Sequence, residues 1–137
     1  MSESCFCGSG IEFEKCCEPY LKGVAIPQTA EQLMRSRYTA YTVQDDNYLI
    51  NTWHSTTRPA KKQVEGGEIK WHRLKVKETF KGGPDDESGE VVFEAIYKIN
   101  GKAHKHYERS LFEKEAGEWR YLDVKKQEGY TNDGTKK

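Results

Sequence analysis

Long apolar runs and an excess of charge of one sign are both absent from this sequence of 137 residues. No stretch approaches the roughly 18 apolar residues of a membrane span, and the N-terminus lacks the hydrophobic region of an export signal. We therefore expect a cytoplasmic protein without a membrane span. Basic and acidic residues are balanced at 22 each, so no net field attracts the chain to nucleic acid or to an anionic membrane.

Cysteine is scarce and is confined to one stretch near the N-terminus. The four cysteines follow the pattern C-x-C, eight residues, C-C. This spacing can bring two short pairs together as a set of four thiolates, which is a ligand set that structural zinc sites use. The sequence therefore predicts a metal site with four ligands: Cys5, Cys7, Cys16 and Cys17.

Two disulfides or four incidental thiols are the alternative to a metal. Pairing Cys5 with Cys7, or Cys16 with Cys17, would close strained rings, and cross-pairing requires an oxidising compartment. A metal therefore accounts for the cluster better. Zinc and a rubredoxin-like iron centre both accept four thiolates, and we favour one Zn²⁺ ion per chain.

The stretch CFCGSGIEFEKCC resembles the SEC-C motif, a small zinc module named from the C-terminus of the bacterial preprotein translocase ATPase. Three further segments resemble the YchJ-like family of bacterial proteins: LMRSRYTAY at 33–41, DDNYLINTWH at 45–54 and YERSLF at 107–112. The resemblance implies a SEC-C module followed by an α+β domain of the nuclear transport factor 2-like, cystatin-like cone type. It also implies a protein partner, because the SEC-C module of the translocase contacts a chaperone and the ribosome.

The apolar pattern independently predicts two helices after the cysteine stretch. Thr29 and Gln32 have the spacing of a capping box, and the helix that they open carries one stripe along its face: Met34, Tyr38 and Tyr41. Asp45 or Asp46 caps a second helix, which carries an apolar pair four residues apart: Leu49 and Trp53. Residues 60–68 have the composition of an exposed loop.

From Ile69 the apolar period changes to two, which predicts strands. Three side chains of the first strand are expected to face the core: Leu74, Val76 and Phe80. After a loop over 82–89, the second strand has a longer apolar face: Val91, Phe93, Ala95, Tyr97 and Ile99. Asn100-Gly101 predicts a hairpin, because a type I′ turn needs positive φ at both central positions. A last strand is expected over 119–124.

The two-residue turn predicts the register of this hairpin. If Ile99 pairs with Lys102, the apolar face of one strand lies opposite polar residues of the next: Tyr97 faces His104, Ala95 faces His106, Phe93 faces Glu108 and Val91 faces Ser110. Helices followed by antiparallel strands give an α+β fold in which the helices cover one face of a curved sheet.

We divide the chain into a SEC-C zinc-binding module over 1–23, an α+β domain over 28–126 and a mobile polar tail over 127–137. All four predicted ligands lie within the first segment, so the metal closes one short loop. We therefore expect metal loss to unfold that module alone and to leave the α+β domain folded.

The predicted register places polar side chains over an apolar floor on the helix-covered face of the sheet. Such a surface can bind a small molecule. Four residues of the sheet and two of the helices make up the candidate pocket: Phe93, His106, Glu108, Ser110, Arg35 and His54.

Each polar residue of this pocket also has a structural interpretation. Glu108 can pair with an arginine and hold a helix to the sheet, which we favour because paired carboxylates inside a domain are commonly structural. His54 stands at a helix end, where an imidazole commonly caps carbonyls. The segment Arg35–Arg37 is typical of a solvated helix face, although it can also reach an anion. The spacing of His104, His106 and Glu108 is a weak alternative for a metal triad.

Two hypotheses for function follow from these patterns. The first is a zinc-binding module fused to an α+β domain that binds a protein or a small molecule without catalysis. The second is an isomerase- or dehydratase-type enzyme that uses the pocket, since folds of this kind host such reactions. The sequence shows no complete acid–base pair, so we favour binding.

Overall fold

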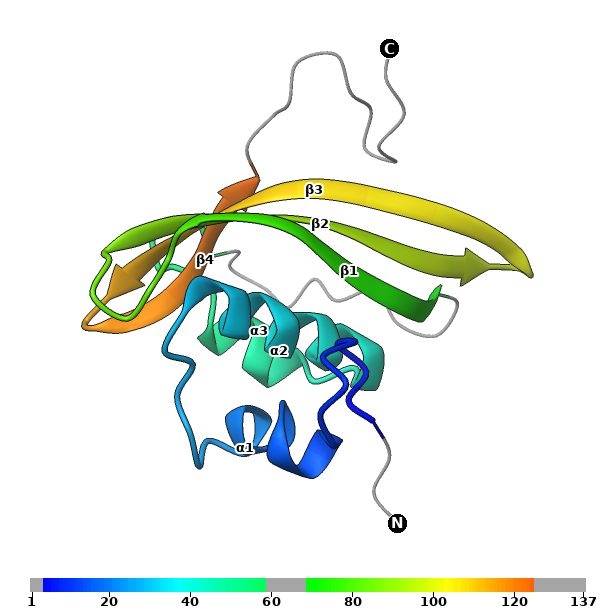
Figure 1. The fold of residues 1–137 in the computed structure, drawn as a ribbon, viewed down its shortest axis with the longest axis horizontal. Coiled ribbons are helices and arrows are strands. Elements are labelled where there is room, and N and C mark those ends of the chain that lie inside the picture. The colour runs from blue at the N-terminus through cyan, green and yellow to red at the C-terminus, as the bar shows by residue number, and fades with distance from the viewer. Residues whose placement is uncertain (1–3, 59–68, 125–137) are drawn as a thin grey trace.

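The computed structural model describes residues 4–58 and 69–124. A four-stranded antiparallel sheet with the order β1-β2-β3-β4 forms one layer, and helices α2 and α3 cover one of its faces (Figure 1). The predicted α+β class is therefore confirmed. The expected loop over 60–68 and tail over 127–137 lie outside the described residues. Within the described ranges, no helix has the length and apolar character needed to cross a bilayer.

Short helical turns follow the first cysteine pair. These are the 3₁₀ turn η1 (Phe13–Lys15) and helix α1 (Glu18–Leu21). The N-terminal segment lies beside α2, on the helix side of the sheet (Figure 1). It therefore adds a further layer to the helical side of the molecule.

Helices α2 (Ala30–Val43) and α3 (Asp46–Asn51) begin at the predicted caps. The hydroxyl of Thr29 accepts a hydrogen bond from the Gln32 N–H at 3.1 Å. The Asp45 carboxylate accepts one from the Tyr48 N–H at 3.1 Å. These bonds satisfy N–H groups of the first turn that have no partner within the helix.

Helix α3 ends before Trp53, which the sequence placed inside it. The chain turns at Thr52 and joins the sheet edge, where the His54 N–H donates to the Tyr121 carbonyl at 2.7 Å and the Tyr121 N–H donates to Thr52 at 2.8 Å. The backbone groups that would continue the helix are thus bonded to strand β4, which the helical spacing of Leu49 and Trp53 did not indicate.

The strands are β1 (Ile69–Lys81), β2 (Ser88–Ile99), β3 (Lys102–Glu115) and β4 (Glu118–Val124). The hairpin turn has φ of 51° at Asn100 and 81° at Gly101, as a type I′ turn requires. Every predicted pair between β2 and β3 is present, including Phe93 opposite Glu108. The predicted register is therefore confirmed.

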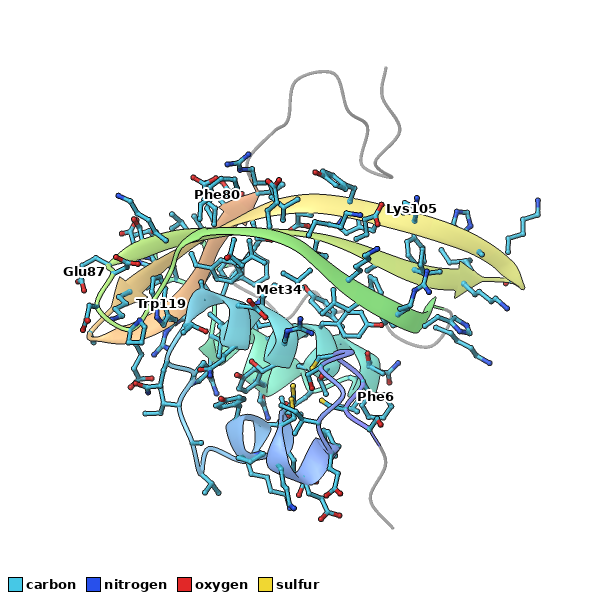
Figure 2. All side chains as sticks on the ribbon, viewed as in Figure 1. Phe6, Met34, Phe80, Glu87, Lys105 and Trp119 are labelled. Atoms are coloured by element: carbon cyan, nitrogen blue, oxygen red, sulfur yellow. The ribbon has the colours of Figure 1, made fainter. Side chains whose placement is uncertain are left out.

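Phe80 lies on the opposite face from the one predicted. A register shift between Val76 and Glu78 adds a residue to β1, after which Phe80 pairs with Glu90 on the outer face. Figure 2 shows Phe80 on the side of the sheet away from the helices, where it is 41% exposed and its ring centroid lies 4.5 Å from the Arg109 guanidinium carbon. A β-bulge reverses which face the following side chains occupy. The strict alternation assumed from the sequence therefore assigned Phe80 to the wrong face of the sheet.

One hydrophobic core fills the space between α2 and the sheet and continues into the cysteine stretch. It contains core residues from helix and sheet together with three of the cysteines: Leu33, Val91, Phe112, Trp119, Cys5, Cys7 and Cys17. Gly8 lies so close to β1 that an added Cβ would be 2.9 Å from the Leu74 carbonyl oxygen. The N-terminal segment is therefore packed into the main core, which argues against its unfolding alone. The division of the chain near residue 23 stays a prediction.

Candidate metal centre and ligand cavity

The four cysteine sulfurs gather at one point beside α2, within 4.8 Å of one another. The sulfur of Cys16 lies 3.6 Å from that of Cys7 and 3.9 Å from that of Cys17. A tetrahedral ion with metal–sulfur bonds of about 2.3 Å holds its sulfurs about 3.8 Å apart. All four are free thiols, so the cluster can hold one four-coordinate metal ion.

Side chains and backbone around the cluster support the ligands. The Ser9 hydroxyl lies 3.2 Å from the Cys16 sulfur, and the Thr39 hydroxyl of α2 lies 3.8 Å from the Cys5 sulfur. Arg35 of α2 donates from Nη1 to the Cys7 carbonyl oxygen at 2.7 Å. Contacts of this kind orient metal ligands and connect them to the fold, here to one helix.

The four thiols affect one another's protonation. Hydrogen bonds from the Cys17 and Cys5 thiols lower the pKa of Cys7. Burial raises the pKa of Cys16 to about 11, and hydrogen bonds to Cys5 and Cys7 raise that of Cys17. One thiolate therefore forms at the expense of its neighbours, whereas a bound divalent ion stabilises all four as thiolates.

A cavity of about 230 Å³ lies between α2 and the sheet. The predicted stripe of α2 forms its helical wall, and four of the six predicted pocket residues belong to its lining. The full lining is Met34, Arg37, Tyr38, Tyr41, Trp71, Phe93, His106, Glu108, Ser110, Phe112 and Tyr121. The cavity is therefore walled mainly by aromatic rings, with polar groups on both the helix and the sheet.

Glu108 is the polar centre of the sheet wall. Its Oε1 accepts a hydrogen bond from His106 Nε2–H at 2.8 Å, and its Oε2 accepts one from the Ser110 hydroxyl. No arginine lies within ion-pair distance of this carboxylate in residues 4–58 and 69–124. The interpretation that Glu108 pairs with an arginine is therefore wrong; its carboxylate is held by two neighbours on the same strand face.

Two predicted pocket residues lie outside the cavity lining. Arg35 points toward the cysteines, where it also bonds Glu31 at 3.0 Å, because it lies about 100° around α2 from Met34. His54 is held by Thr56, whose N–H donates to its Nδ1 at 3.2 Å. The ring of His54 thus accepts from a backbone N–H instead of capping carbonyls.

The weak alternative of a metal triad on β3 does not form. His104 stacks on Tyr97 with ring centroids 5.3 Å apart, away from Glu108 and its partner His106. Among the residues that the structure describes, the cysteines are the group that can hold a metal ion.

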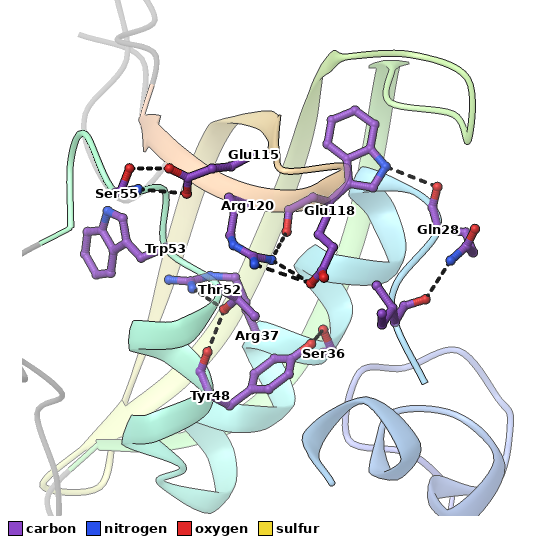
Figure 3. Close-up of polar contacts among 12 residues, drawn as sticks. Gln28, Ser36, Arg37, Tyr48, Thr52, Trp53, Ser55, Glu115, Glu118 and Arg120 are labelled. Carbon is purple, nitrogen blue, oxygen red and sulfur yellow. Dashed lines mark hydrogen bonds and ion pairs between the residues drawn. The ribbon is translucent and has the colours of Figure 1, made fainter. Parts of the chain in front are cut away.

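Arg37 is the charged residue of the cavity lining that the predicted pocket did not include. It is only 5% exposed, and its Nη1 donates to the Leu49 carbonyl at 2.7 Å. The same nitrogen donates to the Thr52 hydroxyl at 2.7 Å (Figure 3). Burial lowers the pKa of Arg37. The signal was present in the sequence, since position 37 follows Met34 by three and precedes Tyr41 by four and so lies on the same helix face.

Comparison with known proteins gives matches along most of the chain. Residues 29–124 match the family described as YchJ, middle NTF2-like domain, and residues 1–19 match the SEC-C motif. The UPF0225 protein XOO0258 of Xanthomonas oryzae pv. oryzae is 43% identical over 126 residues, which cover 90% of this chain and 95% of that protein. The UPF0225 protein SCO1677 of Streptomyces coelicolor is 42% identical over 119 residues, covering 87% and 92%.

Two solved structures share the fold. The solution structure of RPA3114, a SEC-C motif containing protein from Rhodopseudomonas palustris, aligns with a TM-score of 0.81 and 30% identity, covering 90% of this chain and 98% of that one. The crystal structure of a SEC-C motif containing protein from Psychrobacter arcticus aligns with a TM-score of 0.73 and 23% identity, covering 96% and 91%. The chain therefore belongs to the YchJ-like family, in which a SEC-C motif precedes an NTF2-like domain and whose curated relatives carry the name UPF0225.

Proposed function

We propose that this protein binds a small molecule in the cavity between α2 and the sheet. The observation that carries the proposal is a cavity of about 230 Å³ with aromatic walls and two converging charged groups, Arg37 and Glu108. Apolar walls with a few placed polar groups are typical of ligand sites. An apolar cavity of about 150 Å³ in another protein holds benzene, so the space here suits a molecule built on one ring.

We further propose that the metal is zinc and that its role is structural. Four thiolates complete a tetrahedral shell and leave no open position for a substrate, and three of the four cysteines are buried. The bonds from Arg35 to Cys7 and between Thr39 and Cys5 connect this shell to α2. Because the same helix forms one wall of the cavity, the metal is expected to hold that wall in place.

Native mass spectrometry of the protein as purified tests the ligand proposal. We expect a mass above that of the chain plus one zinc, and its loss when the protein is denatured. Ser110→Leu is expected to abolish this extra mass, because Ser110 is 1% exposed and the larger side chain must enter the cavity.

Arg109→Leu is the matched control, since Arg109 neighbours Ser110 on β3 but lies on the outer face with Glu90. It is expected to retain the extra mass. Two results together would contradict the proposal. The wild type would have the mass of the chain plus metal alone, and no one-ring compound would shift the NMR signals of residues that line the cavity.

Acid–base catalysis is a second candidate, favoured by the hydrogen bond of 2.8 Å between His106 and Glu108. A carboxylate that binds one ring nitrogen orients the imidazole and leaves the other nitrogen free to move a proton. If this pair is catalytic, the wild type converts the cavity molecule, and His106→Gln binds it without converting it. The measurement is one-dimensional NMR of that molecule during incubation; an unchanged spectrum with the wild type excludes this candidate.

The protein partner and the cytoplasmic location that the sequence implied stay predictions.

A further inference from the structure

Arg37 is a buried cation that makes no ion pair with a described carboxylate, although the charge of Glu108 acts on it at longer range. Both hydrogens of its Nη1 are used, since it donates to the Leu49 carbonyl and to the Thr52 hydroxyl at the end of α3. Figure 3 shows the bond to Thr52. The guanidinium carbon lies 4.7 Å from the Tyr121 ring centroid and 5.4 Å from that of Trp53, so two aromatic rings contact the cation. In the described part of the chain, no carboxylate lies within 4.0 Å of it.

The other N–H groups of Arg37, on Nε and Nη2, bond no described residue. Among the described residues, however, no fully buried side-chain nitrogen or oxygen lacks a hydrogen-bond partner. The two nitrogens must therefore keep some exposed surface, and Arg37 belongs to the cavity lining. Because Arg37 lines the cavity, we assign this exposed surface, and with it the adjacent donors on Nε and Nη2, to the cavity.

We infer that the cavity selects a small, flat monocarboxylate and that Arg37 binds its carboxylate group through Nε and Nη2. The inference rests on the proposed ligand-binding function. The two donors form the planar fork that a carboxylate accepts with both oxygens, and a buried fork is strongly selective for that geometry. Aromatic walls such as Tyr41, Trp71 and Phe93 favour a flat apolar body for the rest of the molecule.

Glu108 determines the orientation of such a ligand. Its oxygens are bonded to His106 and Ser110, so the carboxylate is held on the sheet wall, where its charge acts on Arg37 without a direct contact. Its charge repels a second negative group. The ligand therefore places its single carboxylate toward α2 and an uncharged end toward the sheet, and dicarboxylates are disfavoured.

The experiment compares benzoate with benzamide, a neutral molecule of nearly the same shape, in NMR titrations of the zinc-loaded protein. We expect both to shift the amide signals of Trp71, Phe93 and Tyr121, with benzoate binding at least about tenfold more tightly. In Arg37→Met, the affinity for benzoate is expected to fall to that for benzamide. The affinity for benzamide should be the same as in the wild type.

Arg109→Met is the matched control, because it removes an equal charge next to Glu108 in sequence but on the outer face of the sheet. It should keep the preference for benzoate. Equal binding of both probes to the wild type overturns the inference and leaves the ligand cavity standing, and this comparison needs no variant to fold. Failure of both probes to shift the cavity signals overturns the inference together with the proposed function.

Discussion

Replacing Cys16 with serine is expected to release the metal and to destabilise α2 and the sheet together with the N-terminal segment. A structural zinc contributes folding free energy on the order of 10 kcal/mol to the structure that it organises. Here that structure includes the main core, since Cys5, Cys7 and Cys17 pack with Leu33. Cys16 is the ligand to change, because it is the least buried of the four and its replacement leaves the smallest packing defect.

Elemental analysis and amide NMR spectra measure this result. The wild type should hold one zinc per chain, whereas Cys16→Ser should hold much less and lose signal dispersion along α2 and around Leu74 of β1. Ser9→Ala is the control, because it keeps four thiols and removes only the hydroxyl 3.2 Å from the Cys16 sulfur. It should stay folded, with metal affinity lower by about 10- to 100-fold. If Cys16→Ser keeps full dispersion from Thr29 to Val124, the N-terminal segment folds separately, as the sequence alone suggested.

The features that could be predicted from the sequence depend on local rules. The turn at Asn100-Gly101 determines the register of twelve paired positions between β2 and β3, because two positive φ angles permit one short hairpin geometry. That register puts Glu108 and Ser110 on the helix-covered face of the sheet, where both belong to the cavity lining. The cysteine cluster could also be predicted from the sequence, since four soft ligands within one short stretch are typical of a metal site.

The features that were missed depend on contacts between distant segments. The bulge after Val76 changes the face of Phe80, yet no residue type at that position marks it. Arg35 and Arg37 were treated as one solvated pair, although helical spacing puts only Arg37 on the face of α2 that carries the predicted stripe. The partners of each arginine come from distant segments, since Arg35 bonds the cysteine loop and Arg37 bonds α3 and lines the cavity. His54 was misplaced for the same reason, because β4 binds the chain where α3 ends.

Gly89→Ala is expected to destabilise the whole fold by about 3 kcal/mol or more. An added Cβ would lie 2.5 Å from the Gly82 Cα and 2.7 Å from the Gly82 nitrogen, and a backbone contact cannot be relieved by rotating a side chain. Gly82 in turn supports the start of α2, since the Ala30 N–H donates to its carbonyl at 2.9 Å. Displacing Gly82 therefore moves the helix that forms the cavity wall and carries Arg37.

Thermal unfolding of the zinc-loaded protein measures this effect, with an expected fall in Tm of about 10 °C. Gly83→Ala is the matched control, because it makes the same substitution in the adjoining loop, where the nearest atom to the new Cβ would be the Asp86 carboxylate oxygen at 3.5 Å. That distance is an ordinary contact, so its Tm should change little. A Gly89→Ala variant as stable as the Gly83→Ala variant would mean that β1 and β2 separate easily at this end. The close contact between Gly82 and Gly89 would then not be what positions α2 over the sheet. The position of the cavity wall would depend on the metal cluster instead.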